Sequence, residues 1–190
     1  MSLMSQSINL YNQLAKHKLF NKTINFNLKR IQLALSKLNH PERKLYNVIQ
    51  VIGSDGKFSV LRALRFFIEE NKQTVSTHVS PSITDIRERF WMGDRYLTHR
   101  EIKKTIKKIE KLKIPLTIYE VLTLVFIINA SNKNTDYVIQ EAGCLWKLDS
   151  NNVIDFPLMQ IIVNINKQHL NFLKIKTLNE VINQKVGYLS

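Results

Sequence analysis

The chain has 190 residues, 44% of them hydrophobic, which suffices for one domain with a core of its own. A single cysteine excludes an internal disulfide and favours a reducing, cytoplasmic setting, and no apolar run is long enough to cross a bilayer. The formal net charge of +13 leaves nucleic acid or an anionic surface open as a partner.

The first part of the chain predicts a helix, a strand and a second helix. Met1–Leu3 precede a second methionine and are interpreted as a cloning remnant, and the residues after them lack the apolar core of a signal peptide. Apolar residues recur at helical spacing over Phe26–Leu38 and again over Phe58–Asn71. Between them, the apolar run Asn47–Gly53 is typical of a buried strand.

The middle of the chain predicts a strand at Gln73–Ser80, followed by a segment without periodicity. That segment, Ser80–Arg100, carries proline, glycine and scattered charges, which predicts a long ordered loop. Two helices are expected next, at Thr98–Lys113 and Thr117–Asn129. The second is the most apolar segment of the chain and has the length of a buried helix.

The last part predicts strands at Asp136–Gly143 and Pro157–Ile165 and a final helix at Thr177–Leu189. Strands that alternate with helices predict an α/β fold with a mainly parallel sheet. Right-handed crossovers then place the loops that follow the strands at one edge of the sheet, where ligands bind in such folds.

The densest group of positive charges lies at His99–Lys113. Ile102, Ile106 and Ile109 fall on one side of the expected helix, and lysines occupy most other positions. This pattern is typical of a solvated helix surface, so a nucleic-acid-binding function is the less favoured interpretation. No recognised nucleic-acid-binding module and no basic patch interleaved with aromatic residues is evident in the sequence.

The stretch GSDGKFS lies between the first predicted strand and the helix after it. It offers glycines that let backbone N–H groups converge on an anion, the positive end of a helix, and a lysine. The pattern Gly-x-x-Gly-Lys is shorter than a Walker loop, so an ordinary turn and a nucleotide site both stay open. In the nucleotide interpretation, ATP contacts Gly53, Ser54, Asp55, Gly56, Lys57 and Ser59.

A nucleotide site of this kind also needs Mg²⁺, which takes oxygen ligands. Ser59 supplies a hydroxyl just inside the helix, and Glu141 supplies a carboxylate at the end of a neighbouring strand. The alternative for Ser59 is an ordinary polar residue of a first helical turn. A carboxylate directly after an apolar strand is costly without a partner, which makes Glu141 the stronger candidate.

Six segments in order carry a resemblance to a known family. They are LNHPERKLYNVIQVIGSDGKFS, VSPSI with ERF, LTIYEVLTLVF, VIQEAGCLWKLDSNNVI, IIVNINKQH and TLNEVINQKVGYL. From about Ile24 to Ser190 the chain resembles the N-terminal part of folylpolyglutamate synthases and dihydrofolate synthases, of the Mur ligase superfamily. The resemblance implies the P-loop NTPase-like topology of the Mur ligase central domain, truncated. Residues 1–23 would be an N-terminal extension, residues 24–190 part of the ATP-binding domain, and the C-terminal glutamate-binding domain would be absent.

The resemblance also implies roles for particular residues. ATP and Mg²⁺ would be the cofactors, with Lys57 on the phosphates, Ser59 and Glu141 on a first Mg²⁺, and His169 on a second. Lys185 matches the lysine that the family carbamylates. Ser80, Pro81 and Asp149 match positions near the pterin substrate.

In that family ATP phosphorylates a substrate carboxylate, and the amine of L-glutamate displaces the phosphate to form an amide. The implied partners are ATP, dihydropteroate or folate, and L-glutamate only where a C-terminal domain is supplied. A truncated sheet would leave an unpaired strand, from which self-association is expected.

Several departures fall on the motifs themselves. Asp55 stands in place of an asparagine, Phe58 in place of a small residue, Ser82 in place of a histidine, and Gln168 in place of an aspartate. Cys144–Trp146 occupies a turn that is rich in glycine in the family. These departures favour, as the alternative to a weak ligase module, a catalytically degenerate protein that binds a nucleotide, a folate or a partner.

Overall fold

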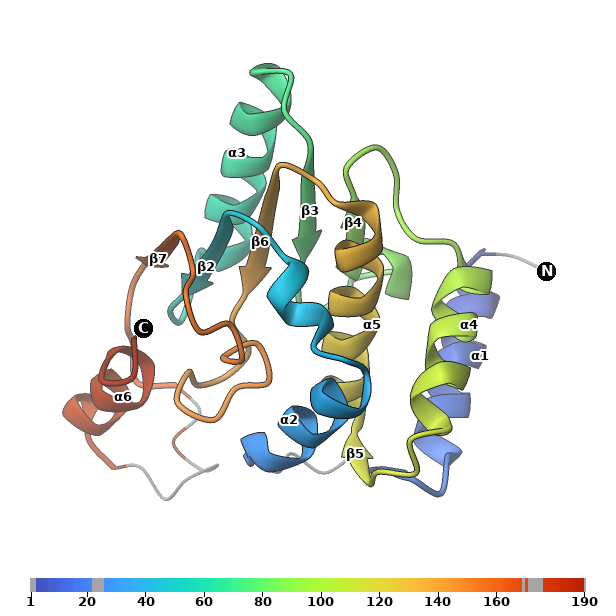
Figure 1. The fold of residues 1–190 in the computed structure, drawn as a ribbon. Helices are drawn as coiled ribbons and strands as arrows, with labels where there is room; N and C mark the ends of the chain where they lie inside the picture. The colour runs from blue at the N-terminus through green and yellow to red at the C-terminus, as the bar shows by residue number, and fades with distance from the viewer. Residues whose placement is uncertain (1–2, 22–25, 169, 171–175, 190) are drawn as a thin grey trace.

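The computed structural model describes residues 3–21, 26–168, 170 and 176–189 (Figure 1). Its helices, including the 3-10 turns η1 and η2, are α1 (Leu3–Lys16), α2 (Leu28–Lys37), η1 (Pro41–Lys44), α3 (Lys57–Glu70), η2 (Ile86–Arg89), α4 (His99–Glu110), α5 (Ile118–Lys133) and α6 (Leu178–Val186). Its strands are β1 (Phe20–Asn21), β2 (Val48–Ile52), β3 (Val75–His78), β4 (Phe90–Met92), β5 (Leu116–Thr117), β6 (Tyr137–Glu141) and β7 (Met159–Ile162).

A five-stranded sheet forms the centre of the molecule (Figure 1). The strand order is β4-β3-β6-β2-β7, with β4 antiparallel to β3 and all other neighbours parallel. Val51 of β2 is in register with Glu141 of β6 and with Ile161 of β7, so the carboxyl ends of these strands share one edge. The prediction of an α/β fold with a mainly parallel sheet is confirmed.

Helices cover both faces of the sheet. Successive strand residues point to opposite faces, so Val48 and Val138 join the core around α5, whereas Ile49 and Ile139 join Leu61 of α3. Each strand of the sheet centre is therefore buried on both sides, which explains its nearly continuous apolar sequence.

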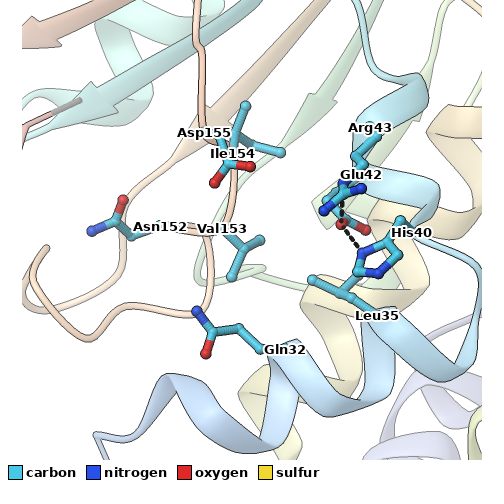
Figure 2. A pocket seen from close by; sticks show the side chains of 9 residues that line it. All are labelled: Gln32, Leu35, His40, Glu42, Arg43, Asn152, Val153, Ile154 and Asp155. Atoms are coloured by element: carbon cyan, nitrogen blue, oxygen red, sulfur yellow. Dashed lines mark hydrogen bonds and ion pairs between the residues drawn. The ribbon is translucent and has the colours of Figure 1, made fainter.

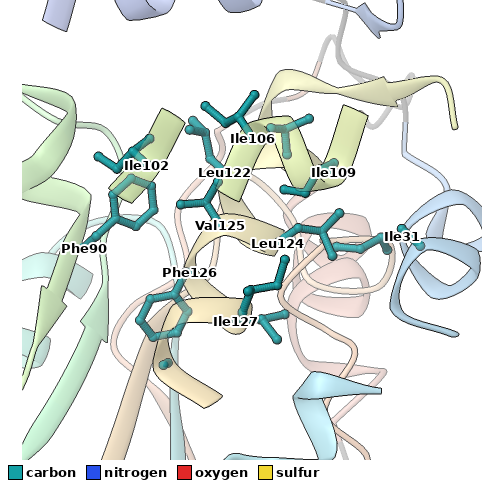
Figure 3. Close-up of a cluster of buried hydrophobic side chains, with 14 of the residues drawn as sticks. Ile31, Phe90, Ile102, Ile106, Ile109, Leu122, Leu124, Val125, Phe126 and Ile127 are labelled. Atoms are coloured by element: carbon teal, nitrogen blue, oxygen red, sulfur yellow. The ribbon is translucent and has the colours of Figure 1, made fainter. Parts of the chain in front are cut away.

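The larger core surrounds α5, in which every residue from Val121 to Ile128 is buried. Figure 3 shows Ile102, Ile106 and Ile109 of α4 directed toward this helix. The three isoleucines are buried and the lysines at positions 104, 107 and 108 are exposed, which confirms the amphipathic pattern predicted for this helix. In the part of the chain that the structure describes, no helix is long and apolar enough to cross a membrane.

The prediction of one long loop at Ser80–Arg100 is wrong in part, because the segment contains η2 and the antiparallel strand β4. Phe90 is buried in the core around α5. Trp91 faces the other way, with the guanidinium of Arg65 3.4 Å from its ring centroid. Contacts on both faces thus hold a three-residue strand that is too short to produce a periodic pattern.

The N-terminal residues form a helix and a short strand that the sequence analysis does not predict. Leu10 and Leu14 of α1 are buried in the core around α5, and β1 pairs in parallel with β5, placing Phe20 beside Leu116. In Figure 1, α1 lies beside α4 at the side of the molecule away from α6. The described part of residues 1–23 therefore packs with the rest of the domain.

Candidate functional site

The loop Gly53–Lys57 leads from β2 into α3 at the carboxyl edge of the sheet. Gly53 and Gly56 have φ angles of 150° and 81°, which favour glycine. A Cβ on Gly53 would lie 2.4 Å from Val163 Cγ2 and 2.7 Å from Asn164 O, whereas a Cβ on Gly56 would meet nothing within 4 Å. The loop is therefore packed tightly against the segment after β7 at one end and is open at the other.

Two lysines converge on the carbonyl of Gly53. Lys57 Nζ donates to Gly53 O at 3.1 Å and to Ser54 O at 2.8 Å. Lys185 of α6 donates to the same Gly53 O at 2.7 Å and to Cys144 O at 2.9 Å. Lys185 is buried, and its burial together with the charge of Lys57 lowers the pKa of its ammonium to about 8. Helix α6 thus brings a buried amine beneath the loop.

The first turn of α3 presents unused helical donors. The first hydrogen bond of the helix runs from Val60 N–H to Gly56 O, so the N–H groups of Lys57, Phe58 and Ser59 precede the helical ladder at its positive end. Ser59 is exposed. Phe58 is 43% exposed, and its ring lies along the outer surface of α3 with the Arg62 guanidinium 5.9 Å from its centroid.

Glu141 is the last residue of β6 and lies at the same edge. The order of strand, glycine loop and helix along the chain predicts this position. It is buried, and its Oε2 accepts a hydrogen bond of 2.8 Å from the backbone N–H of Ser80. Burial raises the pKa of this carboxyl, and the Ser80 hydrogen bond and the charges of Lys57 and Arg89 oppose the rise. The cost expected for a carboxylate in this position is therefore offset by one hydrogen bond and two nearby cations.

Asp149 and the segment after β3 lie at this edge as well. The Ser80–Pro81 peptide bond is cis. Asp149 accepts hydrogen bonds from the N–H groups of Gly143 at 2.8 Å and Asn151 at 2.9 Å. Burial nevertheless dominates and raises the pKa of Asp149 to about 7.

A buried polar network beneath this edge escapes the sequence analysis. Asn151 Nδ2 donates to Tyr119 Oη at 3.0 Å and to Glu141 O at 2.9 Å, and its Oδ1 lies 3.3 Å from His78 Nδ1. Burial and the charge of Arg89 lower the pKa of His78 to about 3, so its ring is neutral at physiological pH. The sequence offers one signal of this network, which is the presence of polar residues at the ends of apolar segments, such as His78 at the end of β3.

Helix α1 also reaches the site. Arg89 Nε donates to Tyr11 Oη at 2.9 Å, and the same hydroxyl lies 2.9 Å from Ser82 Oγ. Ser82 is two residues from Ser80, which binds Glu141. Residues near the N-terminus therefore support the segment that was expected to contact a substrate.

The expected metal ligands are only partly within the described structure. Among the residues described, no three His, Cys, Asp or Glu side chains gather closely enough to hold a metal ion. Ser59 and Glu141 are described, whereas His169 lies outside the described residues. A hydroxyl and a carboxylate are oxygen donors of the kind Mg²⁺ takes, so the two described ligands fit this ion.

A separate pocket of about 370 Å³ lies between the end of α2, η1 and the segment before β7 (Figure 2). His40 Nδ1 lies 2.7 Å from Glu42 Oε1 on its wall. Its lining residues precede β2 and β7 in the chain, whereas the candidate site follows the strands. None of the residues predicted to bind ATP, metal or pterin lines this pocket.

No family model matches the chain. A dihydrofolate synthase/folylpolyglutamate synthase of Bacillus subtilis is 29% identical over 171 residues, which cover 85% of this chain and 39% of that protein. The structure of E. coli FolC in complex with DHPP and ADP matches with a TM-score of 0.86 and 24% identity, covering 98% of this chain and 44% of that one. A bifunctional folylpolyglutamate synthase/dihydrofolate synthase solved with Mn, AMPPNP and L-glutamate gives a TM-score of 0.81, at 21% identity and with 98% and 44% covered.

The mostly parallel sheet, with a glycine-lysine loop at its carboxyl edge, has the fold of the Mur ligase class. The chain spans about two fifths of the length of the curated relatives it matches. Those relatives agree on the group within the class: the chain is similar to dihydrofolate synthases/folylpolyglutamate synthases and is related to these ATP-dependent glutamate ligases.

Proposed function

We propose that this chain is an ATP-binding ligase module of the folate type. Its part in the reaction is to bind ATP and a dihydropteroate or folate, so that the substrate carboxylate becomes an acyl phosphate to which L-glutamate is joined. The observation that carries the proposal is the convergence of Lys57, Lys185 and Glu141 around the glycine loop, in a chain related to such ligases. We propose further that L-glutamate binds a separate domain, without which residues 24–190 are weak or inactive.

The nucleotide phosphates are assigned to Lys57 and to the N–H groups of the first turn of α3. Phosphoryl transfer depends chiefly on positioning and on neutralising charge, which an ammonium and a helix N-terminus supply. Lys57 is half-buried, and its ammonium donates hydrogen bonds to two carbonyls of the loop. A bound phosphate would take the place of these carbonyls as the partner of the ammonium.

Mg²⁺ is assigned to Ser59 and Glu141, with His169 as the proposed ligand of a second ion. The ion supplies neutralisation of the charge on the β- and γ-phosphates. Glu141 is held in place for this role by the Ser80 N–H. Ser80 and Pro81, in the segment that positions Glu141, are assigned to the pterin substrate together with Asp149. The ring N–H groups of a pterin suit the buried carboxyl of Asp149 as an acceptor.

Lys185 is the proposed site of carbamylation. Its neutral amine would add to CO₂, forming an N–C bond and releasing a proton, which turns an ammonium into an anionic group. Burial supports this role, because a pKa of about 8 leaves a larger neutral fraction at physiological pH than an ordinary lysine has.

The decisive experiment is a calorimetric titration of the purified chain with Mg-ATP, before and after Lys57→Ala. We expect the substitution to weaken binding at least about tenfold, because it removes the main side-chain charge offered to the phosphates. Lys104→Ala, on the exposed side of α4, is the matched control and should leave the affinity unchanged. Equal affinity of the Lys57→Ala chain and the original chain would show that the loop is not the nucleotide site.

A binding protein without catalysis is the second candidate function. It is favoured by the carboxylate of Asp55, which lies within the loop proposed to hold phosphates. Binding of Mg-ATP and a pteroate, with no acyl phosphate formed when a complete relative's C-terminal domain is supplied, would favour this candidate.

A further inference from the structure

The segment after β7 forms hydrogen bonds with the backbone of the glycine loop, Gly53–Lys57. Asn164 accepts two hydrogen bonds of 2.8 Å, from Ser54 N–H to its carbonyl oxygen and from Asp55 N–H to its side-chain oxygen. In return, Asn166 N–H donates to Ser54 Oγ at 2.9 Å. Two loop N–H groups that could have faced an anion therefore already have acceptors.

The side chain of Asp55 completes this contact. Asn166 Nδ2 donates to one carboxylate oxygen at 2.8 Å, and Gln168 Nε2 donates to the other at 2.9 Å. These two hydrogen bonds hold the pKa of Asp55 below its usual range, so the carboxylate is ionised at neutral pH. Among the described residues, Asp55 forms no ion pair within 4 Å, so its negative charge is not directly neutralised.

We infer that Asp55 limits the affinity of this loop for a nucleotide, because a clamp fixes its carboxylate in the loop. In this clamp the side-chain amides of Asn166 and Gln168 donate to the carboxylate, and the side-chain oxygen of Asn164 accepts from the Asp55 N–H. The inference rests on the proposed function. The fixed charge repels the phosphates, and the clamp holds the loop closed in the nucleotide-free chain. By Coulomb's law, one fixed charge near the negative charge of Mg-ATP in a water-like medium weakens binding by roughly three- to tenfold.

The pair Asp55 and Gln168 also accounts for two departures from the family pattern at once. The resemblance places an asparagine at position 55 and an aspartate at position 168, and in this chain the two residues contact each other. The amide and the carboxylate have exchanged positions across one hydrogen bond. Relative to the family pattern, the negative charge therefore lies in the glycine loop rather than in the segment after β7.

The test compares the affinity for Mg-ATP of the original chain, of Asp55→Asn and of the exchanged variant Asp55→Asn/Gln168→Asp. We expect both variants to bind roughly three- to tenfold more tightly than the original chain, with a smaller gain at high salt, because salt screens an exposed charge. Asp136→Asn is the matched control, because Asp136 precedes β6 at the opposite sheet edge and accepts hydrogen bonds from Thr74. It should leave the affinity unchanged.

The outcomes separate this inference from the proposed function. If the original chain binds Mg-ATP and Asp55→Asn binds no more tightly, the inference is overturned and the proposed function stands. If no variant binds Mg-ATP, the proposed function fails, and thermal unfolding of the nucleotide-free chain decides on the clamp. The melting temperatures of Asp55→Ala, Gln168→Ala and the double variant are compared with that of the original chain. A decrease in the double variant that differs from the sum of the two single decreases would support the clamp, whereas an additive decrease would overturn it.

Discussion

Burial sets the chemistry of individual side chains at the candidate site. Lys185, Glu141 and Asp149 are each at least 96% buried, and burial disfavours the charged form of each. The pKa of the lysine therefore falls, and the pKa values of the two carboxyls rise. With pKa values of about 8 and about 7, Lys185 and Asp149 change protonation near neutral pH, which ordinary surface lysines and carboxylates do not.

Asp149 makes a measurable contribution to the pH dependence of stability. A carboxyl with a folded pKa of about 7, against an ordinary value of 3.8, binds more protons in the folded chain, so the original chain loses stability as pH rises from about 4 to about 7. In Asp149→Asn this loss is absent. We expect the free energy of unfolding of the variant, relative to the original chain, to be about 1–3 kcal/mol greater at pH 8 than at pH 5.

Urea unfolding at the two pH values measures this difference. Asp136→Asn is the control, because hydrogen bonds from Thr74 lower the pKa of Asp136 and leave it ionised at both pH values. A relative stability of Asp149→Asn that is the same at pH 5 and pH 8 would contradict the assigned pKa.

At the scale of elements, the loop between β2 and α3 depends on its two glycines to different degrees. Both have positive φ angles, but only Gly53 is closely packed, against Val163 and Asn164. We expect Gly53→Ala to lower the free energy of unfolding by about 2–4 kcal/mol, through steric overlap added to backbone strain. Gly56→Ala should cost only about 1–2 kcal/mol, from backbone strain alone.

Chemical denaturation of the two variants side by side tests this pair. The two alanines make the same chemical change three residues apart, so each serves as the other's control. Equal losses of stability would mean that the contact between the loop and the segment after β7 is looser than the structure has it.

The sequence predicts the elements that follow a period and misses those that depend on distant partners. The helix at Thr98–Lys113 and the strand at Asp136–Gly143 were predictable because their apolar spacing repeats over several turns or residues. Strand β4 exists because it pairs with β3 and packs between the core around α5 and Arg65 of α3, and β5 exists because β1 pairs with it. No local pattern carries that information.

The same division applies to the candidate site. The loop and Glu141 could be placed at one edge, because strand direction and right-handed crossovers fix that edge. The network of His78, Tyr119 and Asn151 could not, because it depends on the packing of α5 and on the irregular segment that follows β6. Phe58 could either crowd the loop or turn outward, and its ring lies along the outer surface of α3.

At the scale of the whole molecule, β7 lies at the edge of the sheet and exposes apolar side chains. Phe156 is 94% exposed, and Leu158, Met159 and Ile162 are 56%, 53% and 41% exposed. An edge strand with an apolar surface pairs readily with another chain. We expect the purified chain to self-associate through this edge, and Ile162→Lys to shift it toward the monomer in sedimentation experiments.

Leu33→Lys is the control, because Leu33 is a half-exposed apolar residue on α2, away from the edge strand. The same runs with a short DNA duplex test the basic surface of α4, where Arg100 and several lysines line a broad groove. We expect the duplex to change nothing. A monomer that binds the duplex more weakly as salt increases would instead support binding of nucleic acid through phosphates.

The contacts that hold the glycine loop in place join segments that are far apart along the chain and are therefore synthesised at different times. Asp55 and Asn164 are 109 residues apart, and Lys185 follows Gly53 by 132 residues. At roughly 5–20 residues per second, a ribosome takes on the order of 7–26 seconds to add those 132 residues. A nascent chain therefore exposes its glycine loop for seconds before the residues that hold it exist, and the candidate site cannot be completed until Lys185 has been added.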